Sequence, residues 1–172
     1  MKHIIPTQIE RKIESNHFII SKTDLKGVIT YCNETFMDIV GATEEELLGQ
    51  PHSIIRHPDM PKSIFKKLWT DLHARKEVFA FVKNLCFDGS YYWVFANVSP
   101  SFDENGELIG YYSVRRQVAD ELIPTFEDLY SKILLTEQSM DVDAGLSYLT
   151  SFLNDQGMDY DKFIAHVAKT KE

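Results

Sequence analysis

Three strand-like runs that follow one another across short turns constrain the fold of this 172-residue chain most strongly. The runs cover residues 78–85, 91–99 and 108–116, and the turns between them contain Gly89 and Gly106. Glycine supplies the positive φ that a tight hairpin loop needs. Consecutive strands joined by such short turns pair in the antiparallel sense. This half of the chain therefore predicts an antiparallel sheet.

The residues before these runs add two strands and several helices. Residues 18–22 and 28–32 are strand-like, and Asn33 and Thr43 are good N-caps for short helices. Apolar residues at three- and four-residue intervals predict an amphipathic helix over residues 61–74. The order of two strands, helices and three strands predicts an α+β fold, in which short helices gather on one face of a five-stranded antiparallel sheet.

The periodicity divides the chain into three parts. We predict an N-terminal cap helix over residues 1–16, the α+β domain over residues 17–118, and a helical tail without strands over residues 119–172. The length and the 44% hydrophobic content suffice for one core with an appendage.

Charge and apolar patterning exclude several classes of function. The formal net charge is -8, and no basic run is longer than two residues, as in Arg115-Arg116, which argues against binding to nucleic acid. No apolar run approaches the ~20 residues of a membrane span, so we expect a cytoplasmic protein without direct membrane insertion. Cys32 and Cys86 lack the spacing of metal or redox motifs. No activated nucleophile, phosphate-binding glycine loop or kinase motif is present, and no enzyme is predicted.

The run PHSIIRHPDMP, residues 51–61, is too polar and too stiff for ordinary core. It precedes the amphipathic helix and looks suited to holding a ligand. His52, His57 and Asp59 superficially offer a metal-binding set. The histidines are not placed at i and i+4 on a helix, however, so we expect no metal site.

Several strings resemble a PAS domain over about residues 17–118. They are GVITYCNETFMDIVGATEEELLGQ, YYWVFANVSP and GELIGYYSVRR. Within that family, GQPHSIIRHPDMP and FVKN resemble the flavin-binding PAS domain of the bacterial aerotaxis receptor type, a group of energy-taxis and redox sensors. Val78 and Ala80 depart from the Trp and Gly of that group, so the pocket wall is expected to differ there.

The resemblance implies a PAS redox or energy sensor that binds FAD noncovalently. FMN is an alternative, as are a haem-binding sensor with an axial His52 or His57 and a ligand-free dimerisation or interaction module. The resemblance also implies a homodimer that signals in trans to a chemoreceptor or its membrane-bound partner. His52 stands where light-sensing relatives carry an adduct-forming cysteine, so we expect no cysteinyl photoadduct.

Strand parity selects two candidates on the sheet. Asn84 shares a strand face with small residues, and in flavin-binding relatives this position hydrogen-bonds the polar edge of the ring. The alternative is an asparagine that caps the strand. Tyr112, together with Val114, is expected to face the pocket from the last strand, either as a flavin contact or as a core tyrosine.

Other candidates come from the 51–61 run and the helix after it. His52 is expected near the ring, and Arg56 and His57 near phosphate or ring oxygens. For the latter two, the alternative is a surface loop pair bonded to Asp59. Asp59 either contacts the ligand or caps the helix that follows. Trp69 lies on the apolar face of that helix, where core packing and cofactor contact are both open.

The outer face of the sheet is predicted to be aromatic. Parity places Phe79, Phe81, Trp93 and Phe95 there, away from the pocket. These residues, with the amphipathic tail, are the expected docking or dimerisation surface. The alternative is that the N-terminal helix or the tail covers them.

Overall fold

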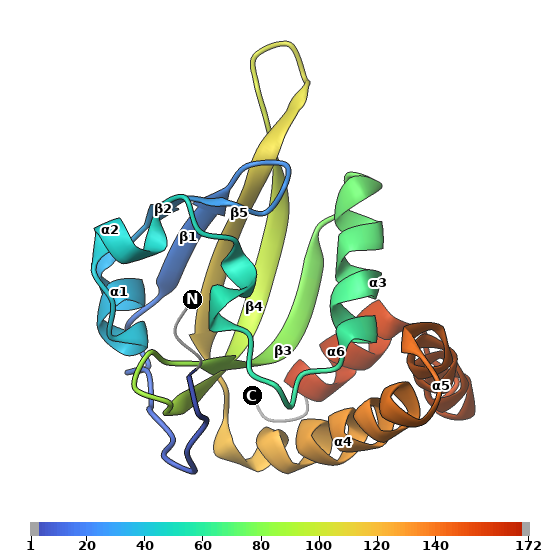
Figure 1. Ribbon diagram of the computed structural model, residues 1–172. Coiled ribbons are helices and arrows are strands. Elements are labelled where there is room, and N and C mark those ends of the chain that lie inside the picture. Colours follow the sequence, from blue (N-terminus) through green and yellow to red (C-terminus); the bar gives the residue numbers. More distant parts are fainter. Residues whose placement is uncertain (1–3, 170–172) are drawn as a thin grey trace.

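A computed structural model describes residues 4–169, in which five strands form one antiparallel sheet in the order β2-β1-β5-β4-β3. The strands are β1 (Ile19–Thr23), β2 (Ile29–Cys32), β3 (Val78–Leu85), β4 (Tyr91–Phe102) and β5 (Leu108–Gln117). The predicted α+β fold with a five-stranded sheet is confirmed. Strands β4 and β5 extend beyond their neighbours as a projecting hairpin (Figure 1).

The elements between β2 and β3 cover one face of this sheet (Figure 1). They are α1 (Glu34–Val40), α2 (Glu44–Leu47), the 3-10 turn η1 (His52–Ile55) and α3 (Lys62–His73). Asn33 caps α1 by accepting a hydrogen bond from the Phe36 amide, and Thr43 and Glu46 form a reciprocal capping box at α2. The predicted N-caps are therefore confirmed.

The strand register decides which side chains face this helical layer. Val98 pairs with Ser113, and Ala96 pairs with Arg115. Residues directly opposite in a ladder project on the same face. Strand β5 therefore turns Ser113, Arg115 and, by alternation, Tyr111 toward the helices.

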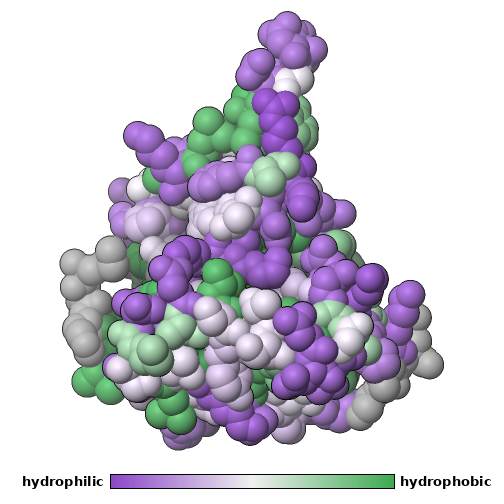
Figure 2. Space-filling view, turned by 90° about the vertical axis from the view of Figure 1, so that its right-hand side faces the viewer, coloured by the Kyte–Doolittle hydropathy of each residue, from purple (hydrophilic) through white to green (hydrophobic). Residues whose placement is uncertain are grey.

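The tail is helical, as predicted. It consists of the 3-10 turn η2 (Asp120–Leu122), α4 (Ile123–Ser139), α5 (Val142–Asp155) and α6 (Tyr160–Lys169). Its outward surface is mostly hydrophilic on the side that Figure 2 shows, because its apolar side chains face inward. None of the helices within residues 4–169 has the length and apolar character needed to cross a bilayer.

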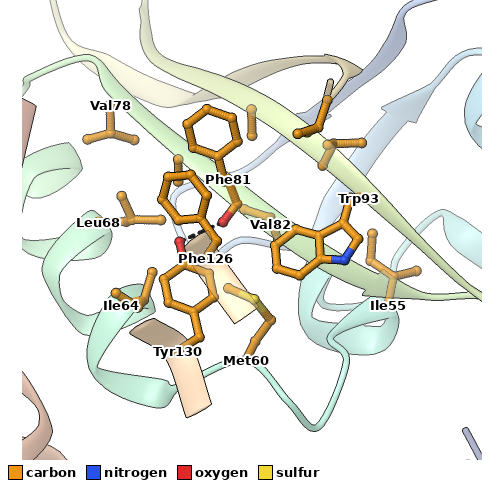
Figure 3. Packing of buried hydrophobic residues seen from close by; sticks show 14 of the residues in the cluster. Ile55, Met60, Ile64, Leu68, Val78, Phe81, Val82, Trp93, Phe126 and Tyr130 are labelled. Carbon is orange, nitrogen blue, oxygen red and sulfur yellow. Dashed lines mark hydrogen bonds between the residues drawn. The ribbon is translucent and has the colours of Figure 1, made fainter. Parts of the chain in front are cut away.

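The tail covers part of the outer sheet face. Phe126 of α4 stacks on Phe81 with ring centroids 4.1 Å apart, and the Tyr130 hydroxyl donates to the Phe81 carbonyl at 2.7 Å (Figure 3). Trp93 lies against Tyr130 and is 5% exposed. The expectation that Phe81 and Trp93 form a free docking surface is therefore wrong, because the tail buries both. Phe79 remains 38% exposed.

The segment before β1 is extended, and the predicted N-terminal cap helix is wrong for residues 4–16; residues 1–3 lie outside the described part. The Thr7 and Arg11 amides donate to the carbonyls of Gly89 and Tyr91, each at 2.7 Å. Pairing with the β3–β4 hairpin thus takes the place of helical hydrogen bonds. A Cβ atom at Gly89 would overlap the Ile5 carbonyl, so this close approach requires glycine.

Candidate functional site

A cavity of about 290 Å³ lies between α3 and the sheet. Strands β3 and β4 contribute the aliphatic side chains of Val78, Ala80, Val82, Ala96 and Val98. Helix α3 contributes Phe65, Leu68, Trp69 and Leu72. The volume lies near the lower end of the ~300–1,000 Å³ typical of small-molecule sites. Apolar walls on two opposite sides suit the faces of a planar ring.

The charged residues on the cavity wall are all basic. Lys26, Arg56 and Arg115 contribute to the lining, and no aspartate or glutamate is among the described residues that do. The whole chain, by contrast, carries a formal charge of -8. A positive lining in an acidic protein favours a ligand with negative charge or exposed acceptor atoms.

Arg115 is the most unusual of these residues, since it is only 2% exposed. Its Nη2 donates to the Ser21 hydroxyl at 2.6 Å, and its guanidinium carbon lies 4.5 Å from the centre of the Phe36 ring. Burial lowers the pKa of Arg115 to about 10, which leaves it charged at neutral pH. Its Nε and Nη1 atoms are buried and have no hydrogen-bond partner among the described residues. Such unpaired donors are costly unless a ligand satisfies them.

His52 belongs to the same network. Its Nε2 lies 3.1 Å from the Ser21 hydroxyl, within hydrogen-bond distance, and the same hydroxyl accepts from Arg115. Its ring stacks on Phe36 at 5.8 Å. Burial, followed by the positive charge of Arg115, lowers the pKa of His52 to about 3. A neutral imidazole at the cavity wall is thus linked to a buried cation through one hydroxyl.

Asn84 and Arg56 meet at the edge of the sheet. An isolated antiparallel bridge joins the two residues, and both line the cavity. Asn84 is 5% exposed. The Arg56 guanidinium lies 3.9 Å from the centre of the Phe65 ring, and its Nε atom is buried without a partner in the described chain. The parity prediction that Asn84 faces the pocket is confirmed; its role in flavin recognition stays a prediction.

His57 and Asp59 lie outside the cavity wall. The His57 Nδ1 accepts from the Asp59 amide at 3.1 Å, and its ring packs edge-on against Tyr91. The Asp59 carboxylate accepts from the Lys83 ammonium at 2.7 Å. Neither His57 nor Asp59 is thus part of the cavity lining, where a ligand contact was expected. The His57 Nδ1 and the Asp59 carboxylate are engaged at the edge of β3, and the His57 Nε2 is buried without a partner among the described residues.

The alternative role of Asp59 as a helix cap is also wrong. The first two amides of α3, those of Lys62 and Ser63, donate to the carboxylate of Glu137 at 3.0 and 2.7 Å. Helix α4 thus supplies the cap that the local sequence lacks, since Pro61 stands at the N-cap position without a side-chain acceptor.

The predicted orientation of β5 is wrong by one residue. Tyr111 lines the cavity, whereas Tyr112 lies on the outer face, where the Lys22 ammonium is 5.9 Å from the centre of its ring. Strand parity predicted that the more apolar face, with Val114, lies toward the core. The cavity instead takes the more polar face, and the outer face of this strand is itself half-buried. Because the predicted facing of β5 was inverted, Arg115 was not among the predicted site residues. The one sequence signal for Arg115 is that it lies on the same strand face as Tyr111.

Trp69 lines the cavity as well as packing in the core. Its ring meets Tyr111 at 5.3 Å in an edge-on arrangement. The Tyr111 hydroxyl is buried and has no hydrogen-bond partner among residues 4–169. Together with Asn84 and Arg115, it adds a further polar group that a ligand could engage.

Other chemistry finds less support in the described residues. They contain no group of three or more histidine, cysteine, aspartate or glutamate residues placed to hold a metal ion. Cys32 and Cys86 are buried free thiols, and burial raises the pKa of both, which disfavours the reactive thiolate.

Comparison with known proteins agrees with the fold. Residues 7–138 match the PAS fold family. The chain is 38% identical over 144 residues to the aerotaxis receptor of Escherichia coli, covering 84% of this chain and 28% of the receptor. It is 28% identical over 107 residues to the nitrogen fixation regulatory protein of Klebsiella pneumoniae, covering 62% of this chain and 22% of that protein. The chain thus spans about a quarter of the length of these relatives.

Solved structures share the same fold. The light-state structure of the blue-light photoreceptor Aureochrome1 LOV has a TM-score of 0.55 at 20% identity, covering 74% of this chain and 94% of that one. A PAS domain from Colwellia psychrerythraea has a TM-score of 0.54 at 23% identity, covering 59% of this chain and 86% of that one.

Proposed function

Because the chain belongs to the PAS family, we propose that it is a redox or energy sensor that binds FAD noncovalently in the cavity beside α3. The observation that carries the proposal is Arg115, a buried cation whose Nε and Nη1 donors have no partner in the described chain. Similarity to the aerotaxis receptor of Escherichia coli supports the signalling role.

The residues present fit a flavin. The aliphatic residues of β3 and β4 and the aromatic side of α3 would hold the two faces of the ring. Arg115 and Tyr111 offer donors, and the Asn84 carboxamide offers both donors and an acceptor, to the carbonyl and nitrogen edge of the ring. Arg56 and the exposed Lys26 would hold phosphate oxygens.

A bound flavin supplies reversible one- and two-electron redox chemistry. Arg115 favours whichever redox form carries more negative charge, because no carboxylate on the described cavity wall offsets its own charge. A change in its hydrogen bonds passes to Ser21 and then to His52, which share one hydrogen-bond chain. These residues therefore sense the charge of the ligand and convert it into a local rearrangement.

Haem fits the cavity less well. The Nε2 atom of His52 is engaged by Ser21, and His57 is absent from the described cavity lining. An axial ligand would need a free imidazole nitrogen at the wall. A ligand-free interaction module would leave the donors of Arg115 permanently unsatisfied.

The signalling partner belongs to the same proposal. We assign it as a chemoreceptor or its membrane-bound partner. The present chain would meet this partner in the cytoplasm as a homodimer. Of the four aromatic residues that parity placed on the outer face, the tail leaves Phe79 and Phe95 partly accessible, and they are the contact points we propose.

The absorption spectrum of the purified protein, with and without added FAD, tests the proposal. We expect paired near-ultraviolet and blue bands that bleach on reduction. A single intense Soret band would indicate haem instead. A colourless protein that fails to take up added FAD would contradict the flavin proposal.

Matched arginine variants test the site. Arg115→Met should lower FAD occupancy strongly, because it removes the buried donors while keeping a similar volume. Arg116→Met is the control, since Arg116 is the exposed neighbour on the opposite face of β5. Equal and stoichiometric FAD in both variants would remove Arg115 from the site.

A further inference from the structure

Helix α3 stands beside β3, and α5 and α6 of the tail lie near its lower end (Figure 1). One face of the helix carries the cavity-lining residues Phe65, Leu68, Trp69 and Leu72. Three residues on the opposite face of the helix, Ser63, Lys66 and Lys67, contact the three tail helices. Any displacement of α3 that a ligand causes therefore reaches the tail directly.

Glu137 makes the principal polar contact between helix α3 and the tail. Its carboxylate accepts from the amides of Lys62 and Ser63, at 3.0 and 2.7 Å, across 75 and 74 residues of sequence. A carboxylate at a helix N-terminus satisfies free amides and interacts favourably with the helix dipole. The N-terminus of α3 is thus completed by α4 and by no side chain of its own segment.

The packing around this contact leaves little freedom. A Cβ atom on Gly145 of α5 would lie 2.5 Å from the Glu137 Cγ and 3.1 Å from the Ser63 hydroxyl. The Lys66 ammonium pairs with Asp143 of the same helix. Helices α3, α4 and α5 therefore meet at one closely packed junction.

Helix α6 adds a separate contact. The Lys67 ammonium lies 4.7 Å from the centre of the Tyr160 ring, and the Tyr160 hydroxyl is buried. The charged face of α3 is thus occupied by the tail along its first two turns.

We infer that Glu137 couples the tail to the cavity, so that docking of α5 and α6 on α3 and binding of ligand change each other's free energy. This inference rests on the proposed function for the identity of the ligand, FAD. Coupling of this kind is reciprocal: if the docked tail alters FAD affinity, FAD alters tail docking by the same factor. The tail is then the element that reports the state of the cavity.

A second anchor keeps the coupling testable. Tyr130 and Phe126 attach α4 to Phe81 on the sheet, independently of Glu137 (Figure 3). Loss of the Glu137 charge should loosen the junction at α3 while α4 stays attached to the sheet. A Glu137 variant is thus expected to fold.

The first experiment compares Glu137→Gln with Glu127→Gln, an exposed glutamate on the same helix. FAD affinity is measured by titration, and hydrogen exchange of residues 142–155 is followed with and without FAD. We expect FAD to change that exchange in the wild-type and Glu127→Gln proteins. In Glu137→Gln we expect the FAD response of the tail to be lost and FAD affinity to change by at least about fivefold. A wild-type affinity together with a wild-type exchange response in Glu137→Gln would overturn the inference.

A second experiment needs no cofactor. Trp69→Ala alters the cavity face of α3, and Val98→Ala alters the cavity wall on β4 as a control. We expect faster exchange of residues 142–155 in Trp69→Ala and not in Val98→Ala. In the Glu137→Gln background, we expect Trp69→Ala to cause no further increase. An equal increase in both backgrounds, or none in either, would overturn the coupling. Failure of the wild type to bind FAD would instead contradict the proposed function.

Discussion

The two halves of the segment from residue 51 to residue 61 contain similar residues but contact different parts of the molecule. In the first half, His52 and Arg56 line the cavity. In the second half, His57, Asp59 and Met60 lie at the edge of β3, outside the cavity lining. Each half contains a buried or partly buried histidine, yet one faces the ligand site and the other packs against Tyr91.

The second half acts as a clamp on an edge strand. The Lys83 amide donates to the Met60 sulfur at 3.3 Å, and the Lys83 ammonium bonds to Asp59. Unpaired backbone groups on a sheet edge need such cover. Because the Arg56–Asn84 bridge lies on the same edge, the clamp also holds the ligand-facing half in register. The run is polar and stiff because it both covers the edge of β3 and positions the residues that line the cavity.

The largest effect on folding is expected from Met60→Ala in the clamp. Met60 is 3% exposed within the core, so truncation should lower the free energy of unfolding by about 2–5 kcal/mol, as measured by urea denaturation. Met140→Ala, at a residue that is 74% exposed, is the control. A Met60→Ala protein as stable as the wild type would show that the clamp does not contribute to folding.

The ligand-facing half should give the opposite result. Arg56→Ala removes a charged donor from the cavity wall, so FAD affinity should fall by about tenfold or more, equivalent to ~1.5–3 kcal/mol. The unfolding free energy without FAD should change by less than about 1 kcal/mol. Isothermal titration and urea denaturation measure the two quantities. A large loss of stability with unchanged affinity would reverse the assignment of the two halves.

The two histidines should share a pH dependence of stability. Burial lowers the pKa of His52 to about 3 and that of His57 to about 4, so between pH 6.5 and 4 the unfolded chain binds more protons than the folded one. Their stabilising contribution is complete above pH 6.5 and is lost as the pH falls, by about 1.4 kcal/mol per pH unit for each histidine.

Single variants separate the two histidines. His52→Gln and His57→Gln should each remove one histidine's share of the slope in urea denaturation series between pH 6.5 and 4. Only His52→Gln should also alter FAD affinity, since His57 is not part of the described cavity lining. Equal effects of both variants on affinity at neutral pH would argue that the clamp and the cavity wall are one unit.

The sequence predicts the sheet better than it predicts the site. Residues 78–85 form β3 as expected, because a short apolar run rich in valine and phenylalanine, followed by a glycine turn, leaves few other solutions. Asn84 faces the cavity because it shares a strand face with Ala80. Parity fails at Tyr112, because tail and helices bury both faces of the sheet and the polar face is the one turned inward.

Other features depend on contacts that local patterns do not encode. Glu137, which caps α3, lies 74 residues after Ser63 in the sequence, so no local capping motif predicts this contact. Arg115 is a charge in a buried position, which hydrophobic patterning assigns to the surface. The segment before β1 pairs with Gly89 and Tyr91 where its apolar residues suggest a helix.

The smallest effect is expected from Asp59→Asn, which separates the charge of the clamp from its shape. The Asp59 carboxylate is 61% exposed, so its pairing with Lys83 is screened by solvent and should contribute less than about 1 kcal/mol to the free energy of unfolding. Asparagine keeps an acceptor oxygen for Lys83, so the geometry of the clamp should survive. The difference from the wild type should shrink further in 1 M NaCl, where surface charges are screened within ~3 Å. A loss comparable to that of Met60→Ala would mean that the clamp is held by its ion pair, and the polarity of the second half would then be as necessary as that of the first.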